Sequence, residues 1–477
     1  MRKLAIIDQT VSAGGVERFL HGLIRGAISS GLIADWEVVL VRSRLNSARI
    51  ELPWPQHLQH PNLRLEYLGG DNRLSRFLDR LTRRGRVLGI RGSGLALKTL
   101  ADVIRSVGPD SWRAYCGDTR LWIEKYLREN RFDVVYFSYP FFLDPPRTTT
   151  PIVATPHDFI FKYGLFGTPA LRRQIEAEVP RWFEACSELV VSTQFVADDL
   201  AKFYPEWAHK AQVIRLGIPT AEREPTQLEI DAFRESKGLP ENFALIVGWI
   251  VEHKNHKVAF EAVAKLRDRG RRIPLVLVGP NSHLLADAAR GHKPPSSSYV
   301  GQIAQFCKDA NLVHGVDYFS LGYVDDFGLD CLYRCATMLI VPTLVEAGSF
   351  PASEAMRVGC PVVFSSAPVY REAIDLVNGN AWIFPPHESS TLADLIADLT
   401  DNWEETERRA KEAQALIPCV LSWDKAAKGY FSVFSRVANR RGRIDKNSDA
   451  RAGLGRHQQS VQKERTGQEL DEGRQLV

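Results

Sequence analysis

The chain has 477 residues, enough for two or three domains, and its 44% hydrophobic and 25% charged residues are typical of a soluble globular protein. A formal net charge of +4, mixed along most of the chain, does not indicate a nucleic-acid partner. No apolar run approaches the ~18 residues of a membrane span. The apolar run in the opening MRKLAIIDQT is too short for a signal peptide, so we expect a cytoplasmic protein.

Short apolar runs alternate with amphipathic stretches in the first half of the chain. A strand at 3–8 is followed by a glycine turn at 12–15 and a helix at 16–28. Further strands are expected at 36–42, 133–138, 151–156, 188–193 and 210–219. This order predicts a parallel sheet with helices on its faces.

A second series of the same kind follows the polar segment 219–240, which contains three prolines and is typical of a domain boundary. We expect helices at 257–270 and 327–336, and strands at 243–249, 274–279, 317–324, 337–342, 361–365 and 381–385. The fold class is therefore α/β, with two doubly wound domains. Such sheets bind ligands at the carboxyl ends of their strands, which places the site in the cleft between the domains.

Two stretches fall outside this pattern. Residues 73–105 carry nine Arg or Lys against two Asp, with leucines at helical spacing. This is either an insertion helix with a solvated basic face or a surface that docks on an anionic membrane or an acidic acceptor. The tail 440–477 is polar and nearly free of aromatic residues, so we expect it to be disordered.

The cysteines point to a reduced compartment. They are odd in number, and several lie in apolar runs, as Cys360 does in GCPVVF. Cys331 and Cys335 are spaced like a metal clip, but no second Cys/His pair with zinc-ligand spacing accompanies them. We therefore expect no metal site.

The segment EAGSFPASEAMRVGC carries two glutamates, Glu346 and Glu354, separated by seven residues. Pro351 suits the first turn of a helix and Gly359 suits its end, so Glu346 is placed on a loop and Glu354 in the first helical turn. Free amides at a helix N-terminus attract phosphate, and carboxylates accept hydrogen bonds from vicinal hydroxyls. A nucleotide sugar offers both groups. The plainer interpretation also stands: Glu354 complements the helix dipole, and Glu346 is a solvated charge.

The two glutamates resemble the E-x7-E signature of retaining glycosyltransferases of family 4, which have the GT-B fold of two Rossmann-like domains. Other stretches are similar to that family in its own order: SAGGVERFL, PIVATPHDFIF, ELVVSTQFVADDL, ALIVGWIVEHKNH and SWDKAAKGYFSVF. The resemblance covers residues 1–45 and 130–436. It implies an acceptor-side domain at 1–218, with a variable basic insertion at 70–125, and a nucleotide-sugar-binding domain at 219–418. A crossing helix at 419–439 and the tail at 440–477 follow.

The resemblance also implies roles for particular residues. Contacts to the donor sugar and the ribose are expected from Glu346, Glu354 and the backbone of Gly348, Ser349 and Phe350. Contacts to the phosphates, the reacting sugar and the base are expected from Lys254, Gly14, Gly15, His157, Tyr323 and Val324. Plainer interpretations remain: Lys254 is a surface lysine, Gly14 and Gly15 form only a tight turn, and His157 is a core histidine. Asp158 is interpreted as an orienting or capping residue.

The implied activity is transfer of a sugar from a nucleotide-diphosphate donor to a hydroxyl of a polysaccharide or lipid-linked glycan, with retention and without metal or cofactor. In the family the departing phosphate is thought to accept the acceptor's proton. The triplet Lys254-Asn255-His256 resembles the mannosyltransferase-like, O-antigen-type branch and favours GDP-mannose, in surface glycan synthesis at the inner membrane face.

Two features depart from the family. Trp249 stands where an arginine is common, and the loop reads Glu-Ala-Gly-Ser in place of Glu-Gly-Phe-Gly. Two alternatives therefore remain open: a GT-B nucleotide-sugar epimerase, or a non-catalytic nucleotide- or glycan-binding protein on the same fold.

Overall fold

The computed structural model describes residues 1–8, 15–43, 55, 58–68, 119–141, 144–292, 294–296 and 298–440. The basic stretch 73–105, the tail beyond residue 440 and Gly14 lie outside the described residues, so the expectations for them stay predictions. The insertion 70–125 is described only from residue 119, where a helix begins.

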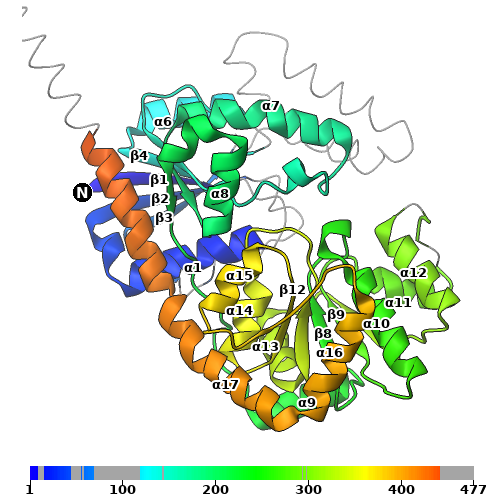
Figure 1. The fold of residues 1–477 in the computed structure, drawn as a ribbon. Helices are drawn as coiled ribbons and strands as arrows, with labels where there is room; N and C mark the ends of the chain where they lie inside the picture. Colours follow the sequence, from blue (N-terminus) through cyan, green and yellow to red (C-terminus); the bar gives the residue numbers. More distant parts are fainter. Residues whose placement is uncertain are drawn as a thin grey trace, which may run out of the picture.

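The first half of the chain folds around a seven-stranded parallel sheet in the order β3-β2-β1-β4-β5-β6-β7 (Figure 1). Its strands are β1 (Arg2–Asp8), β2 (Trp36–Ser43), β3 (Leu63–Leu68), β4 (Val134–Phe137), β5 (Ile152–Ala154), β6 (Cys186–Val191) and β7 (Ala211–Val213). The α-helices described in this half are α1 (Gly15–Ser29), α6 (Thr119–Asn130), α7 (Pro169–Ala185) and α8 (Gln194–Phe203). β4 is buried along its whole length and β1 from Leu4 to Asp8, as expected for strands of a parallel sheet with helices on both faces.

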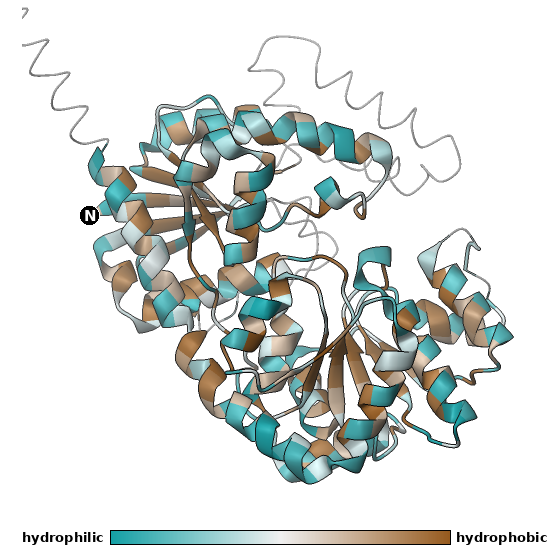
Figure 2. Ribbon diagram, viewed as in Figure 1, coloured by the Kyte–Doolittle hydropathy of each residue, from teal (hydrophilic) through white to brown (hydrophobic). Residues whose placement is uncertain are grey.

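The second half repeats this plan with a six-stranded parallel sheet in the order β10-β9-β8-β11-β12-β13. Its strands are β8 (Ala244–Val247), β9 (Leu275–Val278), β10 (Tyr318–Gly322), β11 (Met338–Val341), β12 (Val362–Ser365) and β13 (Trp382–Phe384). The helices are α9 (Gln227–Ser236), α10 (His256–Asp268), α11 (His283–Ala289), α12 (Tyr299–Asp309), α13 (Asp326–Cys335), α14 (Phe350–Arg357), α15 (Val369–Asp375), α16 (Ser389–Asp401) and α17 (Trp403–Val420). Figure 2 shows hydrophobic strands at the centre of each half and hydrophilic residues on the outer helices.

Both sheets have the strand order 3-2-1-4-5-6 of the doubly wound fold, counted within each half, and the first adds β7 at one edge. The order reverses between β1 and β4 in the first half and between β8 and β11 in the second. The carboxyl ends of strands at such a reversal form a crevice. The loops after β8 and β11 are those that carry Lys254 and Glu346.

Residues 403–440 cross back from the second half to the first (Figure 1). α17 packs on α14, and residues 423–440 form a helix whose buried side chains join the core of the first half, among them Tyr430, Phe431 and Phe434. At the crossing, the indole of Trp423 lies where any side chain at Gly22 or Gly217 would collide with it. Its Nε1 donates to the Ile218 carbonyl oxygen at 3.0 Å.

The expected fold class is confirmed, and two expectations for individual segments are incomplete. β3, at an edge of the sheet, is not among the expected strands: its sequence LRLEYL alternates apolar and polar residues and lacks the continuous apolar run from which the other strands were predicted. The segment 219–240 is not a plain linker, since it contains α9, which begins with a capping box between Thr226 and Glu229. No helix among the described residues is both long and apolar enough to cross a bilayer.

Candidate active site

A cavity of about 380 Å³ lies between the two halves of the fold. The first half contributes Gly15 at the start of α1, His157 and Asp158 after β5, and Arg215 after β7. The second half contributes residues after β8 and β11 and residues of α14 and α15, chiefly Lys254, Glu346, Gly348, Ser349, Phe350, Tyr370 and Glu372. The cavity therefore lies at the reversal point of the second sheet and faces the first.

Glu346 is the centre of the polar side of the cavity. Its carboxylate is 7% exposed, forms an ion pair with the Lys254 ammonium and accepts a hydrogen bond from the Tyr370 hydroxyl. Burial and the nearby carboxylate both raise the pKa of Tyr370, so its hydroxyl stays a donor. The Leu344 N–H donates to the His253 carbonyl at 2.7 Å, which joins the two loops that carry Lys254 and Glu346.

The backbone between the two glutamates presents unused donors. Within the described part of the chain, the N–H groups of Gly348, Ser349 and Phe350 have no hydrogen-bond partner, and all three residues line the cavity. Gly348 has φ +154°, a conformation that strains any residue with a side chain. The Ser349 hydroxyl accepts from the Ala352 N–H at 3.3 Å and caps α14. Three free N–H groups beside a lysine suit an anion.

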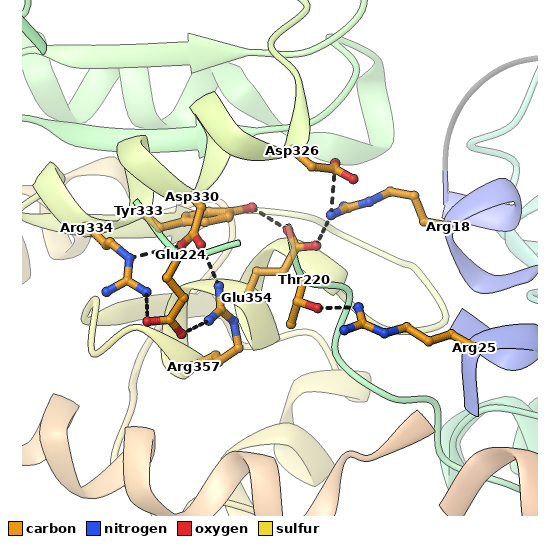
Figure 3. Close-up of polar contacts among 10 residues, drawn as sticks. All are labelled: Arg18, Arg25, Thr220, Glu224, Asp326, Asp330, Tyr333, Arg334, Glu354 and Arg357. Atoms are coloured by element: carbon orange, nitrogen blue, oxygen red, sulfur yellow. Dashed lines mark hydrogen bonds and ion pairs between the residues drawn. The ribbon is translucent and has the colours of Figure 1, made fainter. Parts of the chain in front are cut away.

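Glu354 lies further along α14 than the sequence indicates. The helix begins at Phe350, so Glu354 is its fifth residue, and the expectation that it sits in the first turn is wrong. Its side chain lies between Tyr333 and Arg18 (Figure 3), and Glu354 is not among the residues that line the cavity. The Tyr333 hydroxyl donates to Oε2 at 2.8 Å, and the Arg18 guanidinium pairs with Oε1. Burial raises the pKa of Glu354, although the attraction of Arg18 opposes that change.

His157 and Asp158 form the opposite wall of the cavity. The ring nitrogen Nε2 of His157 lies 2.7 Å from the Ser138 carbonyl oxygen and therefore carries the proton, since a carbonyl only accepts. Burial lowers the pKa of His157 to about 4, so the ring is neutral at neutral pH. Asp158 Oδ1 accepts from the Ile160 N–H at 3.1 Å, and burial raises its pKa to about 6, with Glu346 adding to the rise.

Of the remaining residues named in the sequence analysis, Gly15 lines the cavity, and Tyr323, Val324 and Trp249 do not. Gly15 lines the cavity, and a β-carbon there would meet no atom within 4 Å, so no protein contact requires a glycine at this position. Tyr323 and Val324 follow β10 and do not line the cavity; the Tyr323 side chain is 71% exposed. Trp249 is 46% exposed and also lies outside the lining residues.

Two family patterns cover most of the chain. Glycosyl transferases group 1 matches residues 229–416, and Glycosyltransferase Family 4 matches residues 13–222. The chain belongs to the family 4-type glycosyltransferases. The two matched ranges correspond to the two halves of the fold, one on each side of the cavity.

The chain has distant relatives along part of its length. An uncharacterized glycosyltransferase of Methanocaldococcus jannaschii is 25% identical over 270 residues, 55% of this chain and 63% of that protein. MMP alpha-(1->4)-mannosyltransferase of Mycolicibacterium hassiacum is 25% identical over 305 residues, 61% of this chain and 66% of that protein. The chain therefore matches less than two-thirds of either relative. Anabaena HepE in complex with UDP-glucose has the same fold, with a TM-score of 0.62 over 91% of this chain and 100% of that chain at 16% identity.

Several residues in or near the cavity are not among those expected from the sequence. Tyr370 follows β12, the strand next to β11. Its position after a strand end is a sequence signal that could have marked it as a site residue. Arg18 lies in the first turn of α1, directly after the glycine turn. Arg215 lines the cavity and pairs with Glu372 on α15 at 2.7 Å. Nothing local in the sequence marks Arg215 as a site residue.

The buried histidines predict that acid destabilises the folded protein. Burial lowers the pKa of His157 and His253 to about 4 and that of His256 to about 3, against about 6.5 in an unfolded chain. Between pH 6.5 and 4 the unfolded chain therefore binds more protons, and the free energy of unfolding falls as the pH falls. Asp158, with a pKa raised to about 6, opposes this change between about pH 6 and 4.

Urea unfolding at pH 7.0, 5.5 and 4.5 measures this dependence. The free energy of unfolding is expected to decrease at each step, and His256→Gln is expected to make the decrease smaller. A value that stays constant or rises between pH 7.0 and 4.5 would contradict the assignment of these histidines as neutral groups.

Proposed function

We propose that this glycosyltransferase moves a sugar from a nucleoside-diphosphate donor to a hydroxyl of a glycan acceptor, with retention of configuration and without a metal. The observation that carries the proposal is the grouping of Lys254, Glu346 and the three free N–H groups before α14 on one cavity wall. The group combines positive charge, unpaired amide donors and a carboxylate acceptor. These are the partners that a sugar diphosphate requires.

The diphosphate is assigned to Lys254 and the backbone of Gly348, Ser349 and Phe350. Negative charge develops on the phosphate as the glycosidic bond breaks, and fixed donors at that position lower the barrier. The N-terminus of a helix stabilises a nearby negative charge by about 0.3–1 kcal/mol at an exposed site. Arg215, on the facing wall, is proposed as the second cation in place of the arginine that Trp249 replaces.

The two carboxylates are assigned to the two sugars of the donor. Glu346 is proposed to accept hydrogen bonds from hydroxyls of the transferred sugar, with Tyr370 holding its second oxygen. Glu354 is proposed to accept from the ribose hydroxyls. His157, neutral and fixed by Ser138, is proposed to lie against the reacting sugar, while Asp158 orients the turn that follows.

The choice of sugar is a proposal that rests on similarity. GDP-mannose is favoured because a mannosyltransferase is among the relatives and because of the triplet Lys254-Asn255-His256. Only Lys254 of this triplet lines the main cavity. Asn255 adopts φ +52° at the start of α10 and donates to the Pro386 carbonyl at 2.6 Å, and His256 is buried. The triplet therefore shapes the loop, and its two other residues do not select the sugar directly.

Donor binding tests the proposal. UDP-, GDP- and ADP-sugars are titrated in EDTA by calorimetry and by thermal shift, and one nucleotide class is expected to bind. At 100 times its dissociation constant, that donor should add about 2.7 kcal/mol to the free energy of unfolding. Glu354→Gln is expected to weaken binding by about 10-fold to 100-fold, because a hydrogen bond to a charged group contributes about 1.5–3 kcal/mol.

Glu404→Gln serves as the control, since Glu404 is exposed on α17, whereas Glu354 is buried and pairs with Arg18 of the first half. This variant should bind the donor as the wild type does. If no donor binds to the folded wild type, or if Glu354→Gln binds as tightly as Glu404→Gln, the proposed role of Glu354 is wrong. Incubation of donor with and without glycan acceptor then separates transfer from epimerisation.

A further inference from the structure

The carboxylate assigned to the ribose is already occupied by an arginine from the other half of the fold (Figure 3). Arg18 projects from α1, and its guanidinium pairs with Glu354 Oε1. The other carboxylate oxygen accepts from the Tyr333 hydroxyl at 2.8 Å. The Glu354 side chain is 3% exposed in this arrangement. A ribose hydroxyl therefore cannot reach Glu354 unless Arg18 moves.

A second carboxylate lies beside the same guanidinium. Asp326, at the start of α13, is 3.4 Å from Arg18 Nη2, and its side chain is 57% exposed. Asp326 is therefore open to solvent, whereas Glu354 is not. If Arg18 left Glu354, it would keep an anionic partner without crossing back to the first half of the fold.

Arg25 provides an internal comparison on the same helix. It lies seven residues further along α1, and its guanidinium donates to Thr220 Oγ1 at 2.9 Å in the segment that joins the two halves. This contact is exposed and involves no carboxylate. Both arginines connect α1 with the second half of the chain, but only Arg18 contacts a residue assigned to the donor.

We propose that Arg18 is a built-in competitor of the donor: it holds Glu354 across the cleft in the empty enzyme, and the ribose displaces it toward Asp326. The inference rests on the proposed role of Glu354 in binding the ribose. It gives the site a conformational control, because the apparent dissociation constant equals the intrinsic one divided by the fraction of molecules in which Glu354 is free. Displacement of Arg18 exchanges one contact between the two halves, with Glu354, for another, with Asp326.

The test compares Arg18→Met with Arg25→Met. Calorimetric titrations use UDP, GDP and ADP at pH 8, because a high pH favours the ionised form of the Glu354 carboxyl, whose pKa burial raises. Methionine retains most of the apolar stem of arginine and removes the charge. Arg18→Met is expected to bind the preferred nucleotide at least fivefold more tightly than the wild type. Arg25→Met is expected to bind it within twofold of the wild type. Equal or weaker binding by Arg18→Met overturns the proposal.

Asp326→Asn provides an independent test that does not alter Arg18 or Glu354. Removing the second carboxylate leaves Arg18 with Glu354 alone, so nucleotide binding is expected to weaken by at least threefold. Unchanged or tighter binding would contradict the proposal even if Arg18→Met did not fold. If neither the wild type nor any variant binds a nucleotide, the proposed function and this inference fail together. If the wild type binds and Glu354→Gln weakens binding, but Arg18→Met does not tighten it, only the competition is wrong.

Discussion

Glu346→Gln is expected to lower kcat for sugar transfer by about 100-fold to 1,000-fold, the range typical for loss of one polar group that stabilises a transition state. The amide keeps the size of the side chain and its hydrogen bond to Tyr370 but removes the negative charge that holds the Lys254 ammonium. Lys254 then loses its fixed position beside the departing phosphate. Transfer of labelled sugar at saturating donor and acceptor measures the effect.

Two further variants make this result specific to the site. Tyr370→Phe leaves the charge of Glu346 intact and removes one of its partners, so its kcat should fall less than that of Glu346→Gln. Glu404→Gln should retain wild-type kcat. Urea unfolding of all three variants shows whether the fold is intact. If Glu346→Gln is folded and its kcat is within fivefold of wild type, Glu346 does not have the role proposed for it.

Trp423→Ala is expected to lower the free energy of unfolding by about 3–5 kcal/mol, as for other large buried side chains truncated to alanine. Trp423 is 9% exposed and packs at the crossing of α1, the joining segment and the last helix. Truncation leaves a cavity there and also removes the hydrogen bond to the Ile218 carbonyl, 3.0 Å in the intact protein. Equilibrium unfolding in urea, followed by circular dichroism, measures the change.

Trp403→Ala is the matched control, because Trp403 is 42% exposed at the start of α17. Surface substitutions of this kind usually change stability by less than about 0.5 kcal/mol. Gly26→Val tests the same packing from the opposite side: a β-carbon at residue 26 would lie 2.2 Å from the Trp423 carbonyl oxygen, so the backbone must shift. Equal losses for Trp423→Ala and Trp403→Ala would show that the crossing does not depend on the indole.

The local pattern of apolar and polar residues was sufficient to predict most of the strands and helices of the fold. The buried strands of a parallel sheet are short continuous apolar runs, and β1, β4, β8 and β11 could be located from that property alone. β3 has no continuous apolar run, and its signal is instead the apolar/polar alternation of LRLEYL, typical of a half-buried edge strand. α9 was not predicted, because it lies in a polar segment, although its Thr226–Glu229 capping box is a sequence signal for the start of a helix.

For the site, the sequence by itself determined the loop and helix that carry Glu346 and Glu354, and the loop that carries Lys254, because strand ends and helix caps are set by neighbouring residues. The partners of those groups were decided only by the tertiary structure. Tyr370 contacts Glu346 from 24 residues away, and Arg18 contacts Glu354 from the opposite half of the fold. Such contacts depend on how two sheets and a crossing helix are placed relative to one another. No local propensity encodes that placement, because it results from burial of the surfaces between the halves.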